Sequence, residues 1–201
     1  MESPALSEFD LHLFAEGRHW HIYNVLGAHP LRVSGKEGVR FAVWAPNARS
    51  VSVIGDFNGW NSAQHVMRAN ESSGVWSLFI PGVQPGAIYK FAISTARGEI
   101  IKTDPYGQAF EHRPSNAAVV TERGRYPWGD GDWLDKRSRF DWQHRPICIY
   151  EVHPGSWQHH GSGRWLTYRE LADQLVPYVL ETGFTHIELL PITEHPLDES
   201  W

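Results

Sequence analysis

Two strand patterns with a helix pattern between them end the sequence, and this order constrains the fold more than any other feature. Ile147–Val152 is a short apolar run of the kind that buried parallel strands carry. Thr185–Leu190 is a second such run, and residues 167–183 between them carry the signals of a helix. A strand–helix–strand unit is nearly always right-handed and predicts an α/β barrel or an open sheet. Because the sequence ends at Trp201, we expect a barrel begun here to be closed only by a longer chain.

The helix predicted between these strands has a defined start, face and end. Thr167 and Glu170 form a capping box, in which each side chain can bond to the backbone N–H of the other residue. Gly183 stands where a left-handed residue is favoured after a helix. The apolar face is assigned to Leu171, Leu175, Val179 and Leu180. The segment is therefore expected to pack as an amphipathic helix.

The first half of the sequence follows a different pattern, with apolar residues alternating along short stretches separated by turns. This period is typical of half-buried strands and predicts them at Val39–Ala45, Ser50–Ile54, Val75–Ile80 and Ile88–Ile93. A last strand pair is expected between Glu99–Lys102 and Ala117–Val120, and a short helix at Glu8–Phe14. Many short strands with closely spaced turns predict an immunoglobulin-like β-sandwich.

These patterns divide the chain into four parts. Residues 1–25 are an N-terminal segment or linker, and residues 26–121 are the β-sandwich. Residues 122–145 are charged and show neither strand nor helix period, so we interpret them as a connector. Residues 146–201 begin an α/β domain. The predicted fold class is therefore mixed: an all-β sandwich followed by the first β–α–β of a (β/α)₈ TIM-type barrel that is incomplete in this chain.

Composition and charge exclude several classes of partner. Hydrophobic residues make up 41% and charged residues 20% of the chain, as in soluble globular proteins. The net charge of −5 and the lack of a basic run argue against nucleic acid as a partner. We find no apolar stretch of membrane-spanning length and no signal-peptide pattern. The single cysteine, Cys148, suits the reducing cytoplasm, and we expect it to be an inert thiol in the core.

The twelve histidines raise the question of a metal site. The pairs His19/His21 and His159/His160 are not followed by a third ligand at a recognisable zinc spacing. No glycine-rich loop stands in the strand–helix context that binds phosphate. We therefore predict neither a metal nor another cofactor. The ten tryptophans, several of them in polar, glycine-rich surroundings, instead suit a surface that stacks on sugar rings.

Six segments are distinctive when they are taken together and in order. They are Asp10–Phe14, Leu26–His29, Arg40–Ala48, Ile149–Trp157, Tyr168–Tyr178 and Glu188–Pro196. Along nearly the whole chain these segments resemble the 1,4-α-glucan (glycogen) branching enzymes. The resemblance implies a β-sandwich carbohydrate-binding module followed by the opening of an α-amylase-type (β/α)₈ barrel.

The resemblance also implies an activity and the place of its catalytic groups. Enzymes of this family cut an α-1,4-glucan and transfer the chain to a 6-hydroxyl, which creates the α-1,6 branches of glycogen. Their retaining mechanism uses one carboxylate as nucleophile and a second carboxylic acid as proton donor. In the family these groups and a third Asp follow the fourth, fifth and seventh barrel strands, whereas this chain reaches only the second. The expectation is therefore an inactive fragment without catalytic residues, whose partners are α-1,4-glucans such as glycogen, amylose and malto-oligosaccharides.

Two residues are predicted to bind glucan on the strength of the same resemblance. Trp60, in the loop Phe57–Trp60, occupies the position of a sugar-stacking tryptophan, and Lys90 matches a lysine that bonds to glucose hydroxyls. Ile101 stands where some relatives have a second stacking aromatic. An equally open alternative is that Trp60 packs the module against the barrel. Trp44 and Trp76 lie on strand patterns and are expected in the core.

Two further functional hypotheses stay open from the sequence. The chain could be a standalone α-glucan-binding module, or the corresponding part of a trehalose-releasing hydrolase of the α-amylase superfamily. A third idea, catalysis by the loop carboxylates Glu194, Asp198 and Glu199, is disfavoured, because nothing in their spacing enforces the carboxyl separation of roughly 5 Å that a retaining pair needs.

Overall fold

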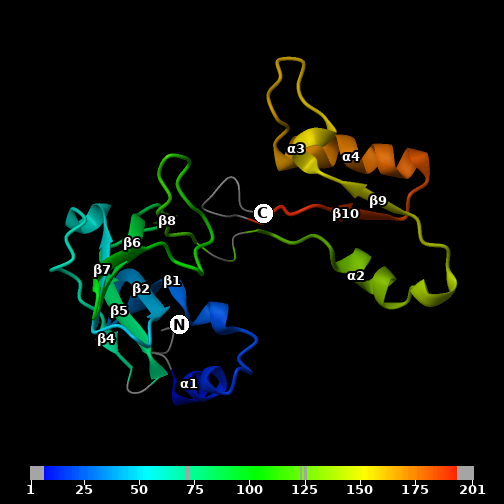
Figure 1. Cartoon of the computed structure of the whole chain (residues 1–201). Coiled ribbons are helices and arrows are strands. Elements are labelled where there is room, and N and C mark those ends of the chain that lie inside the picture. The colour runs from blue at the N-terminus through cyan, green and yellow to red at the C-terminus, as the bar shows by residue number, and fades with distance from the viewer. Residues whose placement is uncertain (1–6, 71–72, 123, 125, 194–201) are drawn as a thin grey trace. The chain divides into compact units, whose positions relative to one another are not determined.

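The computed structural model describes residues 7–70, 73–122, 124 and 126–193, which form two compact units (Figure 1). One unit holds the described residues up to 124, and the other holds residues 126–193. Each unit is described by itself below.

The first unit is built on two antiparallel sheets. The first sheet has the order β1 (Gly27–Val33), β2 (Lys36–Trp44), β5 (Val75–Pro81) and β4 (Arg68–Ala69). The second has the order β3 (Ser50–Gly55), β6 (Ile88–Thr95) and β7 (Gly98–Lys102), with β8 (Ala118–Val119) also paired to β6. The alternating patterns thus correctly predicted β2, β3, β5 and β6.

Two features of these sheets differ from the prediction. The segments at 99–102 and 117–120 do form β7 and β8, but they pair with β6 rather than with each other. β6 is long enough to carry both, because Phe91–Thr95 face β7 while Ile88 and Tyr89 face β8. Strand β1 was not predicted, since Pro30 interrupts its pattern; proline is tolerated there because β1 lies at a sheet edge.

The core of this unit lies between the two sheets. Phe41 of β2 and Phe91 of β6 are fully buried, and both rings meet Tyr89, at centroid distances of 4.9 and 5.8 Å. Valines from β2 and β3 complete the same cluster. Two sheets that share one apolar core form a β-sandwich.

A third layer covers the outer face of the first sheet. Helix α1 (Glu8–Ala15), which confirms the predicted N-terminal helix, and the short 3₁₀ turn η1 (Ile22–Asn24) pack there. Their apolar side chains meet Leu26, Ala42 and Val75, of which Ala42 points away from the inter-sheet core occupied by Phe41. The Arg40 guanidinium on this face donates to the Asn24 and Val25 carbonyl oxygens at 3.3 and 3.2 Å.

The second unit contains the predicted strand–helix–strand unit. Its elements are α2 (Gly131–Ser138), η4 (Trp142–His144), β9 (Ile149–Val152), α3 (Pro154–Trp157), α4 (Tyr168–Thr182) and β10 (His186–Leu189). β9 and β10 pair in parallel, and α4 joins them. The capping box at Thr167 and Glu170 is present, and Gly183 ends the helix with a φ of 82°. Leu171, Leu175 and Val179 are buried against Val152, as the apolar face required.

Two predictions about side chains of this unit are wrong. Leu180 is 71% exposed, because it lies one residue, or about 100° around the helix, from the buried Val179. Cys148 is exposed rather than in the core. The connector does contain a helix, α2, which has no buried residue and so leaves no apolar period in the sequence.

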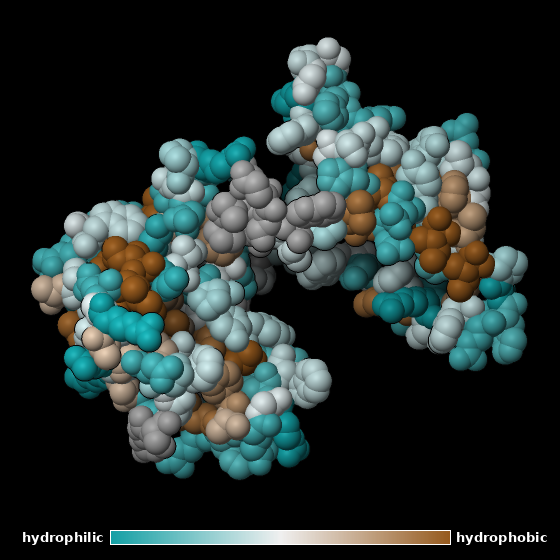
Figure 2. All heavy atoms as spheres, in the orientation of Figure 1, coloured by the Kyte–Doolittle hydropathy of each residue, from teal (hydrophilic) through white to brown (hydrophobic). Residues whose placement is uncertain are grey.

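Many apolar side chains of the second unit reach its surface (Figure 2). They include Ile149 on β9, Ile187 and Leu189 on β10, and Val176 on α4. Across the described part of the chain, no helix is both long and apolar enough to cross a membrane.

Candidate functional site

The loop that carries Trp60 is tied to the end of strand β3. Its short 3₁₀ turn η2 (Asp56–Asn58) follows Gly55 directly. The Asn58 side chain accepts from the Gly55 N–H at 3.0 Å and donates to the Val53 carbonyl at 2.9 Å. The Trp60 N–H donates to the Gly55 carbonyl at 2.9 Å. These bonds connect the loop to the end of β3.

Trp60 itself has an unusual backbone conformation. Its φ is 63°, in the left-handed region that bulky residues rarely occupy. Such a conformation costs of order 1–3 kcal/mol and persists where the surroundings enforce it, which happens often at binding sites. The residue is 43% exposed, so a large part of it is accessible to solvent.

Lys90 lies close to this loop on the second sheet. Its neighbours Tyr89 and Phe91 point into the core, so Lys90 projects from the outer face of β6. In the register of the sheet, Lys90 pairs with Ile54 and Tyr89 pairs with Gly55. Lys90 is therefore one residue pair from the strand end to which Trp60 is bonded.

Asn116 joins this surface, although no sequence signal pointed to it. The Lys90 ammonium donates to the Asn116 side-chain oxygen at 2.5 Å. The Thr103 hydroxyl donates to the Asn116 carbonyl at 2.8 Å and so fixes its backbone. Because β7 and β8 both pair with β6, the segments that follow and precede them meet beside Lys90.

Ile101 is on the same outer face, because it pairs with Ala92, two residues beyond Lys90 on β6. It is 55% exposed and offers an aliphatic side chain in place of a ring. We call Trp60, Lys90, Asn116 and Ile101 the Lys90 face. It combines an exposed indole with an ammonium and an amide that are bonded to each other, a set of groups that suits binding of a hydroxyl-rich ligand. None of its four side chains is a carboxylate.

The other strand tryptophans were assigned to the core, and for Trp44 this is wrong. Trp44 is 54% exposed and contacts Phe14 of α1 edge-on at a centroid distance of 5.9 Å. Trp76 packs against the core and donates its indole N–H to the Ala45 carbonyl at 3.0 Å.

A buried acid, Asp104, is bonded to a side chain of β6, the strand that carries Lys90. Asp104 is 1% exposed and accepts a hydrogen bond from the Tyr89 hydroxyl at 2.5 Å and another from the Tyr106 N–H at 2.8 Å. Burial raises the pKa of Asp104 above its ordinary value, and the two hydrogen bonds offset only part of this effect. Asp104 thus links the strand that carries Lys90 to the segment after β7.

The raised pKa of Asp104 predicts a pH dependence of stability. Between the unfolded pKa, about 4, and the higher folded value, the folded chain binds more protons than the unfolded chain. The contribution of Asp104 to the free energy of unfolding is therefore present in full below about pH 4 and falls as pH rises through this window. Asp104→Asn keeps the shape of the side chain but does not titrate. We therefore expect the free energy of unfolding of the variant to increase relative to that of the parent as pH rises.

Urea unfolding at intervals from pH 4 to pH 8 tests this expectation. Glu99→Gln, at an exposed position on β7, is the matched control. If the parent and Asp104→Asn curves ran parallel across the whole range, the buried carboxyl would not have the pH effect assigned to it.

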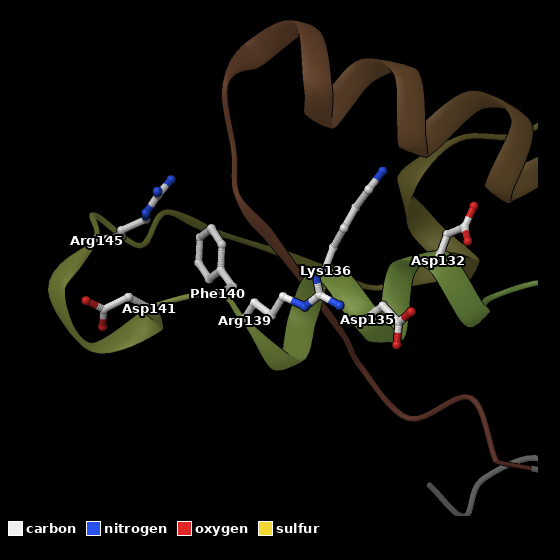
Figure 3. A pocket seen from close by; sticks show the side chains of 7 residues that line it. All are labelled: Asp132, Asp135, Lys136, Arg139, Phe140, Asp141 and Arg145. Carbon is white, nitrogen blue, oxygen red and sulfur yellow. The ribbon is translucent and has the colours of Figure 1, made fainter.

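Two other polar clusters do not form a competing site. The Glu170 carboxylate accepts two hydrogen bonds from the Arg164 guanidinium, at 2.9 and 3.2 Å. These bonds, followed by those from Thr167, lower the pKa of Glu170 and stabilise the start of α4. A hollow of about 480 Å³ along α2 is lined by Phe140 with three acidic and three basic residues, whose side chains point in different directions (Figure 3).

Within the residues that the structure describes, no three His, Cys, Asp or Glu side chains gather closely enough to hold a metal ion. The carboxylates Glu194, Asp198 and Glu199, considered above for catalysis, lie outside the described residues.

Comparisons with known proteins find similarity to a carbohydrate-binding module and to branching enzymes. Residues 25–107 match carbohydrate-binding module 48, the isoamylase N-terminal domain. The whole chain is 81% identical to part of a 1,4-alpha-glucan branching enzyme from Marinobacter nauticus, of which it covers 32%. Over 99% of its length it is 56% identical to a branching enzyme from Cellvibrio japonicus, of which it covers 27%. The chain thus spans about a third or less of the length of these curated relatives.

Two solved structures are similar to this chain in fold. A provisionally assigned alpha amylase from Salmonella typhimurium matches 88% of this chain and 26% of its own, with a TM-score of 0.61 and 25% identity. The apo pullulanase of Klebsiella pneumoniae matches 83% of this chain and 20% of its own, with a TM-score of 0.57 and 24% identity. The second likeness concerns the fold alone.

Proposed function

We propose that the chain is the N-terminal part of a glycogen branching enzyme, because residues 25–107 match carbohydrate-binding module 48 and the whole chain is similar to part of a 1,4-alpha-glucan branching enzyme. The complete enzyme would cut α-1,4-glucan and transfer the chain to a 6-hydroxyl in glycogen biosynthesis, in the cytoplasm. In this proposal the present chain binds glucan and lacks the catalytic carboxylates, so it does not catalyse the transfer alone.

The Lys90 face is the proposed glucan-binding site. The observation that carries this assignment is the Trp60 loop, which has a strained backbone and three fixing hydrogen bonds and is bonded to the end of β3, one residue pair from Lys90. A pyranose ring can stack on the indole, while the ammonium and the Asn116 amide bond to its hydroxyls. With Ile101 in place of a second ring, we expect weak binding of a single glucan chain.

The second unit is proposed to open a (β/α)₈ barrel. Its parallel β9 and β10 with α4 between them are consistent with the first turn of such a barrel. The apolar side chains exposed on β9, β10 and α4 are those that further strands and helices of a barrel would cover.

Titration with maltoheptaose, followed by tryptophan fluorescence, tests the proposed site. We expect Trp60→Ala to weaken binding at least about tenfold, equivalent to about 1.4 kcal/mol, because the stacking surface is lost. Lys90→Met keeps the alkyl chain but removes the charged donor, and we expect a loss of similar size. Trp128→Ala removes an exposed tryptophan from the other unit and is the control for the change in signal. Unchanged affinity in both Trp60→Ala and Lys90→Met would reject the site.

A further inference from the structure

Trp20 is displayed more openly than any other large apolar residue in the described part of the chain. It is 87% exposed, compared with 43% for Trp60. Trp20 lies in the segment between α1 and η1, and it is not one of the residues of the Lys90 face. An exposed indole offers a flat apolar face together with a polar N–H group, and is therefore a candidate contact for a ligand.

The residues on either side of Trp20 are firmly anchored. The His19 imidazole lies 2.9 Å from the Asp10 carboxylate and is only 9% exposed. Ile22 packs against the outer face of the first sheet, and its N–H donates to the His19 carbonyl at 3.2 Å. The segment that carries Trp20 is thus fixed at both ends while the indole itself projects into solvent. A ligand that stacks on it would not need to order the backbone first.

Polar groups lie next to the ring in the chain. The His21 imidazole is 2.9 Å from the Tyr23 hydroxyl, and the two rings meet edge-on at a centroid distance of 5.7 Å. His21 is exposed and Tyr23 is 46% exposed. In the sequence Trp20 is flanked by Arg18 and, on the other side, by His21, both of which are exposed and carry groups that can bond to ligand hydroxyls. A flat ring with hydrogen-bonding neighbours fits a hydroxyl-rich ligand better than it fits an apolar protein surface.

We propose that Trp20, with His21 and Tyr23, forms a second contact surface for α-glucan. The ligand class rests on the function proposed above, but the site does not depend on the Lys90 face. Trp20 is on the layer that covers the outer face of the first sheet, whereas Lys90 projects from the outer face of the second sheet. The two surfaces therefore lie on opposite sides of the sandwich and engage two different glucan segments of a branched polymer.

This placement has a consequence for binding strength. A short linear oligosaccharide binds the two surfaces independently, so each keeps its own weak affinity. A large branched glucan offers many chains at once, and the second contact then forms at a high effective concentration. We expect loss of Trp20 to weaken retention by glycogen more than it weakens binding of maltoheptaose at the Lys90 face.

The test observes both tryptophans in one molecule. The full chain is labelled with 5-fluorotryptophan, and the ¹⁹F resonances of Trp20 and Trp60 are assigned with Trp20→Phe and Trp60→Phe. During a maltoheptaose titration we expect the Trp20 resonance to shift saturably, and to do so again in Trp60→Ala. In affinity electrophoresis through glycogen, we expect Trp20→Ala to lower retention about tenfold with an unchanged urea midpoint.

The outcomes separate this proposal from the one before it. A Trp20 resonance that stays still while that of Trp60 moves would overturn the second surface and leave the Lys90 face intact. A Trp20 shift that disappears in Trp60→Ala would overturn it as well, because the effect would then arise at the Lys90 face. A Trp20 shift with a motionless Trp60 resonance would instead support the second surface and reject the Lys90 face.

Discussion

Replacing Phe91 with alanine is expected to lower the free energy of unfolding of the sandwich by about 3–5 kcal/mol. Phe91 is fully buried, pairs with Val53 across the second sheet and packs edge-on against Tyr89. Removing the ring leaves a cavity between two sheets whose backbone bonds prevent collapse around it. The loss is a large share of the 5–15 kcal/mol that stabilises a typical domain.

Phe9→Ala is the matched control for this prediction. Phe9 is 67% exposed on α1, so the same chemical change is expected to alter stability by no more than about 0.5 kcal/mol. Both variants are measured by urea unfolding followed by far-ultraviolet circular dichroism. A loss below about 1 kcal/mol for Phe91→Ala, or equal losses for the two variants, would contradict the assigned core.

Gly55→Ala is expected to have the second largest effect, about 3 kcal/mol or more, and to remove glucan binding as well. Gly55 has an extended backbone that alanine can adopt, so the cost is steric. A Cβ atom there would collide with the Ile88 carbonyl oxygen and lie 2.7 Å from the ring of Phe57. Relief of this collision must move the end of β3, and the Trp60 loop is bonded to that strand end.

Gly59→Ala, four residues further on in the same loop, separates the two possible causes. Gly59 has a φ of 61°, but a Cβ atom there would meet no atom within 4 Å. Its substitution is expected to cost about 1 kcal/mol through backbone strain alone. Urea unfolding and maltoheptaose titration of both variants provide the comparison. If Gly55→Ala proved no more damaging than Gly59→Ala, close packing at the end of β3 would not be what positions the loop.

The local patterns were sufficient to predict most of the regular elements. Alternation revealed β2, β3, β5 and β6, because each has one face in the core and one face outside it. The capping box and Gly183 located both ends of α4, since these signals depend only on neighbouring backbone groups. Prediction was weaker where a residue's surroundings come from distant parts of the chain. Cys148 and Leu180, both assigned to apolar surroundings, are exposed.

The candidate site shows the same division. Trp60 and Lys90 were named from the sequence through a family resemblance, and their sugar contacts remain predictions. Asn116 could not be named in this way. It reaches Lys90 only because β7 and β8 share one edge of β6, a pairing that the separate strand patterns do not specify.

The sequence by itself determined the order of the two halves, the positions of β2, β3, β5 and β6 along the chain, and the limits of α4. All of these follow from interactions between residues that are close in the chain. The tertiary structure alone decided that the N-terminal segment covers the first sheet, that the buried Asp104 is bonded to the Tyr89 hydroxyl, and that Asn116 is bonded to Lys90. Each of these contacts joins residues far apart in sequence, and its energy exists only after both sheets have brought those residues together.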